Sequence, residues 1–183
     1  TIGDQKITVT NAITVDQANL LGATTTGKLT ATIATTETVT ELATLSADGG
    51  TNELSIVIRS EDATAATADQ LNTINSATAS AVNLTNVTGL AASSLSDLGT
   101  LATAITNNEF SNDTGITTIA VSDTTIDATT LASTIDSYDS INGGSTTGMT
   151  LASGATINVD ADEITHMLLD ETENRLTIGD QKI

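Results

Sequence analysis

The sequence predicts an α/β solenoid of about six strand-turn-helix coils, with parallel strands stacked on one side and short helices on the other. Two repeats support this prediction. Residues 1–7, Thr-Ile-Gly-Asp-Gln-Lys-Ile, recur letter for letter as residues 177–183, and a looser helix-start pattern recurs every 24–35 residues in between. Because each coil of a solenoid contacts only its neighbours, repetition on this scale is typical of that architecture.

The terminal repeat indicates that residues 1–183 are one unit of a longer tandem array. The repeat length is 176 residues, and residues 177–183 overlap the next copy. A unit of this kind is stabilised by packing on its neighbours. We therefore expect no separate globular domain, and we expect identical neighbouring units to pack head to tail in a fibre.

The composition predicts a thin hydrophobic core. Phe110 and Tyr138 are the only aromatic residues and the chain lacks Trp, Pro and Cys, yet hydrophobic residues make up 38% of it. Leu, Ile, Val and Ala at regular spacings can fill a narrow interior. An exposed ring on a loop would favour sugar stacking and a buried ring would favour gap filling. We expect both rings to be buried.

Six segments share the pattern of a helix start. A Thr, Ser or Asp is followed by apolar residues about four and seven positions later, and its side-chain oxygen can accept from the free amides of the first turn. The predicted N-caps are Thr14, Thr38, Thr67, Ser94, Thr125 and Asp160, of which the fifth is out of phase. The predicted buried row on these helices is Leu21, Leu45, Ile74, Leu101, Leu131 and Met167.

Short alternating stretches between the helices predict strands. They span residues 7–9, 29–33, 54–58, 82–85, 116–121, 157–159 and 176–178, with Ile33, Ile56, Leu84 and Ile178 facing the core. A helix between successive strands favours parallel pairing. An all-β parallel β-helix, in which the helical segments are only bends, is the alternative. We expect irregular insertions at 107–115 and 136–148.

The charge balance excludes several partners. The chain carries 5 basic and 23 acidic residues, for a net charge of −18. Such a surface repels nucleic acid and anionic membranes and attracts divalent cations. No run is long and apolar enough to cross a bilayer, so we expect neither nucleic-acid binding nor membrane insertion.

The sequence gives no pattern of a catalytic site. His166 is the only histidine, and we expect it to be a solvated residue on the sixth helix. The chain has no Gly-x-Ser-x-Gly elbow and no glycine-rich phosphate loop. We therefore expect the protein not to be an enzyme.

Carboxylates are the one abundant functional group. Asp160, Asp162 and Glu163 crowd one strand-to-helix junction, and Asp123 and Asp127 flank another. Calcium is bound by roughly six to eight oxygen ligands of this kind. Helix capping is the competing explanation, since neither an EF-hand loop nor a calcium-binding nonapeptide occurs. No cofactor is certain, and calcium at these five residues is the candidate.

The stretches at 121–131 and 67–74, Val-Ser-Asp-Thr-Thr-Ile-Asp-Ala-Thr-Thr-Leu and Thr-Ala-Asp-Gln-Leu-Asn-Thr-Ile, resemble the Thr/Ala/Asp-rich tandem repeats of giant secreted bacterial surface proteins. These include adhesins, S-layer-like proteins and cyanobacterial surface proteins. The resemblance implies secretion, a cell-surface location and a structural or adhesive role. The leading hypothesis is a structural repeat of an extracellular fibre, filament, adhesin stalk or surface layer. The alternative is a solenoid that displays a binding module for glycan, ice or protein.

Overall fold

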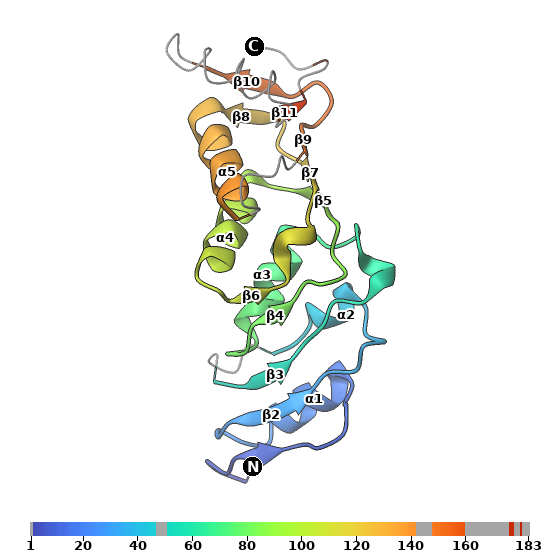
Figure 1. The fold of residues 1–183 in the computed structure, drawn as a ribbon. Helices are drawn as coiled ribbons and strands as arrows, with labels where there is room; N and C mark the ends of the chain where they lie inside the picture. The colour runs from blue at the N-terminus through green and yellow to red at the C-terminus, as the bar shows by residue number, and fades with distance from the viewer. Residues whose placement is uncertain (1, 47–50, 142–147, 160–175, 178–179, 181–183) are drawn as a thin grey trace.

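The computed structural model describes residues 2–46, 51–141, 148–159, 176–177 and 180. The molecule is elongated, with β1 near one end of the long axis and β10 and β11 near the other (Figure 1). The helices are α1 (Val15–Gly22), α2 (Val39–Leu42), α3 (Ala68–Ser76), α4 (Leu95–Thr106) and α5 (Ala128–Ile141), with 3-10 turns η1 (Ser60–Asp62) and η2 (Asp113–Gly115).

Every strand pair in the described ranges is parallel. The strands form four small sheets, ordered β1-β2-β3, β4-β6, β5-β7-β9-β11 and β8-β10. Their bounds are β1 (Ile7–Thr8), β2 (Leu29–Thr32), β3 (Glu53–Ser55), β4 (Val82–Asn83), β5 (Gly89–Ser93), β6 (Phe110–Ser111), β7 (Thr118–Val121), β8 (Thr125–Asp127), β9 (Gly148–Thr150), β10 (Thr156–Asn158) and β11 (Leu176–Thr177).

The predicted α/β solenoid and its parallel β-helix alternative were wrong. The chain has a mixed α/β fold in which short parallel pairs are divided among small sheets, with no continuous stack of strands along the described residues. The spacing between paired strands varies, since Ile7 pairs with Leu29 but Thr125 pairs with Thr156. The register also shifts within the β5–β7 pair. Segments of unequal length cannot keep one register, so each ladder ends after a few strands.

Four predicted helix starts are confirmed. Thr14, Thr38, Thr67 and Ser94 are N-caps, and each side-chain oxygen accepts from the backbone N–H three residues later. At the first three, the side chain of that third residue also accepts from the N-cap backbone, which completes a capping box.

The fifth predicted cap was wrong. Thr125 lies in β8, and α5 begins only at Ala128. The cap is Asp127, whose carboxylate accepts from the Thr130 N–H at 2.9 Å. The sixth predicted cap, Asp160, lies outside the described residues.

Each of the seven predicted strand segments contains a strand, but β5, β6, β8 and β9 were missed. β5 has the sequence Gly-Leu-Ala-Ala-Ser, which lacks the β-branched residues used to recognise strands. The expected insertion at 107–115 contains β6 and η2. Residues 136–141, expected in a loop, belong to α5, and residues 142–147 lie outside the description.

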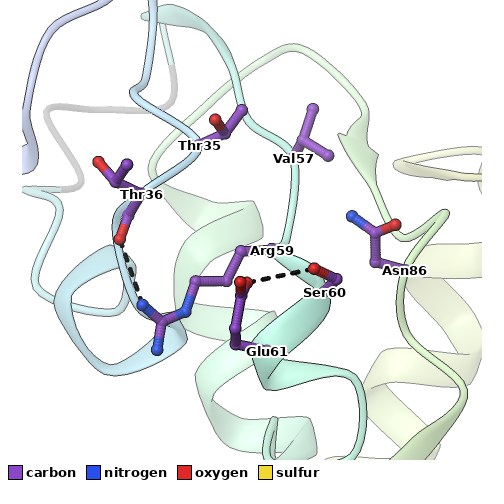
Figure 2. Close-up of a pocket in the computed structure, with 7 residues that line it drawn as sticks. All are labelled: Thr35, Thr36, Val57, Arg59, Ser60, Glu61 and Asn86. Carbon is purple, nitrogen blue, oxygen red and sulfur yellow. Dashed lines mark hydrogen bonds between the residues drawn. The ribbon is translucent and has the colours of Figure 1, made fainter.

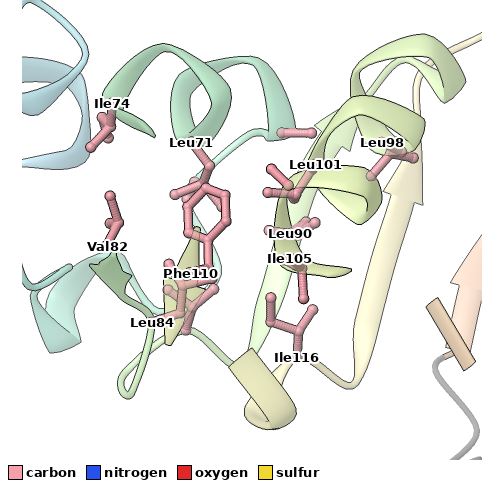
Figure 3. Close-up of a cluster of buried hydrophobic side chains, with 14 of the residues drawn as sticks. Leu71, Ile74, Val82, Leu84, Leu90, Leu98, Leu101, Ile105, Phe110 and Ile116 are labelled. Carbon is pink, nitrogen blue, oxygen red and sulfur yellow. The ribbon is translucent and has the colours of Figure 1, made fainter. Parts of the chain in front are cut away.

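One apolar cluster of aliphatic side chains extends through the described chain. Figure 3 shows its middle part, where the Phe110 ring lies between Leu71 and Leu84. Most of the predicted core row is confirmed as buried, and Leu21 is partly buried against the cluster. Met167 and Ile178 lie outside the described residues. The confirmed residues are Ile33, Leu45, Ile56, Ile74, Leu84, Leu101 and Leu131.

We predict that Leu98→Ala lowers the free energy of unfolding by about 2–5 kcal/mol, because Leu98 is fully buried and truncation leaves a cavity. Leu20→Ala is the matched control, since Leu20 is 67% exposed and its loss should change the free energy by less than about 0.5 kcal/mol. Denaturant unfolding followed by far-ultraviolet circular dichroism measures both. Equal effects of the two substitutions would contradict the described core.

Candidate functional site

Two of the five predicted calcium ligands lie in the described residues, and both bind backbone amides. The Asp123 carboxylate accepts from the Leu95 N–H at 2.7 Å. Asp127 accepts from the Thr130 N–H at 2.9 Å and from the Thr130 hydroxyl at 3.0 Å. These bonds hold the pKa of the Asp127 carboxyl below its usual value. Asp160, Asp162 and Glu163 lie outside the described residues, so their calcium assignment stays a prediction.

Asp123 belongs to a series of contacts that the sequence analysis missed. In each of α1 to α4, the N–H of the first helical residue donates to a side-chain oxygen from the segment that follows that helix in the chain. Asp62 accepts from the Val39 N–H at 2.7 Å, and Ser93 accepts from the Ala68 N–H at 2.9 Å. Glu37 accepts from the Val15 N–H at the longer distance of 3.4 Å.

These contacts complement the N-caps. A helix leaves its first four N–H groups without partners inside the helix. The N-cap of the same helix satisfies the N–H of the third residue, and the oxygen from the following segment satisfies the N–H of the first. We call these oxygens, from Glu37, Asp62, Ser93 and Asp123, the intersegment caps. Three of these four residues are acidic, so part of the acidic excess joins successive segments.

Asp62 is the most buried carboxylate of the intersegment caps, with 7% of its surface exposed. The Arg59 guanidinium binds it through two nitrogens, Nε at 2.9 Å and Nη2 at 3.2 Å. Nη1 of Arg59 donates to the Thr36 carbonyl at 3.3 Å. The hydrogen bond to Asp62 raises the pKa of Arg59 above its ordinary value. One ion pair thus ties η1 to α2 and to the loop before it.

A surface pocket of about 480 Å³ adjoins this ion pair (Figure 2). The Ser60 hydroxyl donates to the Glu61 carboxylate at 3.2 Å. The residues that line the pocket are of six types: Thr, Val, Arg, Ser, Glu and Asn. The lining contains no imidazole, so the Ser60 hydroxyl has no histidine base of the kind found in serine hydrolases. Figure 2 shows the Arg59 guanidinium bound to the Thr36 carbonyl, and its Nε and Nη2 bind Asp62. The lining residues are Thr35, Thr36, Val57, Arg59, Ser60, Glu61 and Asn86.

A second set of buried polar residues links the starts of β1 to β4. Asn52 accepts from the Leu29 N–H at 2.9 Å, and the Thr78 hydroxyl lies 2.8 Å from the Leu54 N–H. The Thr25 hydroxyl donates to the Gly3 carbonyl at 3.0 Å. Burying a polar group without a hydrogen-bond partner costs free energy. Because each of these side chains finds its partner in the neighbouring segment, the contacts favour one pairing of segments over others.

At the other end of the molecule, Asp180 contacts the turn between β9 and β10. Its carboxylate accepts from the Ser153 hydroxyl at 2.6 Å and from the Gly154 N–H at 3.1 Å. The two hydrogen bonds lower the pKa of the Asp180 carboxyl. Gly154 has φ of 69°, which favours glycine at this turn.

Both aromatic rings are buried, as predicted. Phe110 is 4% exposed and Tyr138 is 1% exposed. Burial raises the pKa of the Tyr138 hydroxyl, which has no hydrogen-bond partner among the described residues. Neither ring is exposed for a sugar to stack on, so the two rings do not support glycan binding.

The described ranges contain no group of three or more His, Cys, Asp or Glu side chains that could hold a metal ion. His166 lies outside these ranges. Among the helices that the structure describes, none combines the length and apolar character needed to cross a membrane. Comparison with protein-family models, curated proteins and solved structures finds no match for this chain.

We predict that Asp62→Ala lowers the free energy of unfolding by about 1–3 kcal/mol, because it leaves the Val39 N–H without an acceptor and Arg59 without its carboxylate. Glu61→Ala is the control, since Glu61 is exposed and its carboxylate accepts a hydrogen bond from the exposed Ser60 hydroxyl, so its loss should change the free energy by less than about 0.5 kcal/mol. Denaturant unfolding compares the two. An Asp62→Ala protein as stable as the Glu61→Ala protein would refute the structural role of this intersegment cap.

We predict that the Asp127 cap depends on pH. Because its pKa is lowered in the folded state, the ionised carboxylate stabilises the fold above about pH 4, the pKa of an unfolded Asp, and this contribution is lost as pH falls further. Asp127→Ala should therefore lower the unfolding midpoint at pH 7, with a smaller difference from the parent protein below pH 4. Asp127→Asn keeps the cap without the charge and should remain close to the parent at pH 7. Thermal unfolding from pH 2 to pH 7 measures this. A difference that is independent of pH would contradict it.

Proposed function

We propose that this chain is a structural repeat of an extracellular bacterial surface protein, a fibre, adhesin stalk or surface layer, and that it has no catalytic role. The observation that carries the proposal is the identity of residues 1–7 and 177–183. The first copy enters β1 and the second begins in β11, and these strands lie at opposite ends of an elongated molecule (Figure 1). A repeat whose two copies lie at opposite ends can be extended in one direction.

The role is mechanical. Parallel strand pairs, intersegment caps and the shared apolar cluster each join one segment to the next, so force along the chain is distributed over many short contacts. The exposed acidic side chains give neighbouring molecules a common negative charge, which keeps them soluble or lets divalent cations bridge them.

The extracellular assignment rests on composition and resemblance. The chain has no cysteine, is rich in Thr and Ala, and carries a net charge of −18. These features match the secreted surface repeats described above. The identical partner unit is therefore expected outside the cell, at the cell surface. Calcium bound between units at Asp160, Asp162 and Glu163 is part of the proposal and is tested by unfolding with and without a chelator.

We predict that chains of one, two and three units, each ending with residues 177–183, unfold at progressively higher denaturant concentrations. The physical reason is that unpaired ends become a smaller fraction of the molecule as units are added. A two-unit chain with a flexible Gly/Ser segment inserted between the copies is the control, and it should unfold like a single unit.

Electron microscopy of the same chains supplies the second measurement. Rods that lengthen by a constant increment with each unit would support a structural repeat. Separate beads, together with a midpoint that does not change with the number of units, would overturn the proposal.

A further inference from the structure

Each end of the described structure carries a strand with one edge that has no strand partner among the described residues. β1 pairs only with β2, and β10 pairs only with β8. Such an edge presents N–H and C=O groups that can pair with another strand. The N-terminal end also exposes apolar surface, since Ile2 is 53% exposed and Ile7 and Val9 are only partly buried.

The second copy of the repeated heptapeptide shows how these residues lie on the preceding segment. Thr177, the first residue of this copy, pairs in parallel with Thr150, and Leu176 before it pairs with Met149. Asp180 is then held by Ser153 and Gly154. Thr177 and Asp180, the described residues of the second copy, therefore contact β9 and the turn that follows it.

The first copy shows the opposite side of the same heptapeptide. The Gly3 carbonyl accepts from the Thr25 hydroxyl and from the Thr26 N–H at 2.8 Å. A Cβ atom on Gly27 would clash with the Asp4 carbonyl oxygen, which shows how closely the following segment approaches. These contacts use backbone carbonyls, whereas Asp180 uses its carboxylate toward the preceding segment. One heptapeptide can therefore be held from both sides at once.

The Asp180 contacts and the alternation of buried residues together select a register. Three residues after Asp4 comes Ile7, and three residues after Gly154 comes Ile157. Asp4 of the next unit corresponds to Asp180. If its carboxylate binds the Gly154 N–H as that of Asp180 does, Ile7 of the next unit lies opposite Ile157. Ile157 is buried and pairs with the buried Ile126, and Ile7 pairs with the buried Leu29. This register continues one apolar row across the boundary between units.

The geometry points to a defined junction between identical units: β1 of one copy adds in parallel to the free edge of β10 of the preceding copy. Ile7 lies opposite Ile157, Thr8 lies opposite Asn158, and the Asp4 carboxylate binds Ser153 and Gly154 of the preceding unit. The partner surface is a second copy of this chain. This inference rests on the proposed function, which requires units to pack end to end, and adds the strands and the register.

A cysteine cross-link tests the register directly, because the chain has no cysteine of its own. The protein is a two-unit chain, residues 1–176 followed by 1–183, with Asn158→Cys in the first unit and Thr8→Cys in the second. Opposite residues on paired strands lie about 5 Å apart, within the Cα separation of about 4.4–6.8 Å that disulfides accept. Both positions are exposed. We expect a disulfide to form under mild oxidation, detected by mass and by mobility without reductant.

Two further cysteine pairs serve as the positive and the negative control. Thr125→Cys with Thr156→Cys in one unit joins strands that the structure already pairs, so it sets the rate for a correct register. Thr156→Cys in the first unit with Thr8→Cys in the second is displaced by two residues, and we expect it to oxidise at least about tenfold more slowly, because its Cα atoms lie beyond disulfide reach. Equal rates for the Asn158 and Thr156 pairs, when the Thr125 pair forms, would overturn the proposed junction.

The same substitution placed in different units gives an independent readout. Asp4→Ala in the second unit removes a carboxylate that binds Ser153 and Gly154 of the first, so the unfolding midpoint should fall. Asp4→Ala in the first unit faces no preceding unit and should leave the midpoint unchanged. Identical effects at the two positions would also overturn the junction.

The experiments distinguish failure of the proposed junction from failure of the proposed function. If stability rises with the number of units but the Asn158 cross-link does not form, the array stands and this junction is wrong. If stability does not rise and no cross-link forms, the structural-repeat proposal itself fails.

Discussion

The structure depends on how its helices begin. Each of α1 to α4 starts at a residue whose N–H donates to an oxygen of the following segment, while its own N-cap satisfies another N–H of the first turn. A short helix cannot satisfy these donors within its own turns. Since the missing acceptor comes from the next segment, no segment is complete alone.

The dependence of each segment on polar contacts with the next is consistent with the amino-acid composition. With only two aromatic side chains, both buried, the apolar cluster is built from small aliphatic residues that bury little area each. Polar contacts between segments, such as the Arg59–Asp62 ion pair and the Thr78 contacts with β3, add specificity that a thin core of similar side chains cannot provide. The acidic residues thus have a structural role at helix N-termini as well as a role in solubility.

Local chemistry was predictable from the sequence, and longer-range order was not. Thr14, Thr38, Thr67 and Ser94 were recognisable as N-caps because a cap and its partner lie three residues apart. β8 was missed because Thr125 resembled a cap, and the decision in favour of Asp127 depends on pairing with β10.

The solenoid prediction failed because it assumed that similar segments stack in one register. That register depends on segment lengths and on insertions such as β6 and η2, whose effect is visible only in three dimensions. The intersegment caps escaped prediction for a related reason, since Asp62 and Val39 are 23 positions apart and only packing brings them together.

Amide hydrogen exchange at the first helical residues tests the central claim most directly. If oxygens of the following segment complete the helix N-termini, the Val39 and Leu95 amides should exchange as slowly as amides inside the helices, and Asp62→Ala should accelerate exchange at Val39 but not at Leu95. Exchange at Val39 as fast as at an unprotected amide in the parent protein, or unchanged by Asp62→Ala, would contradict the account.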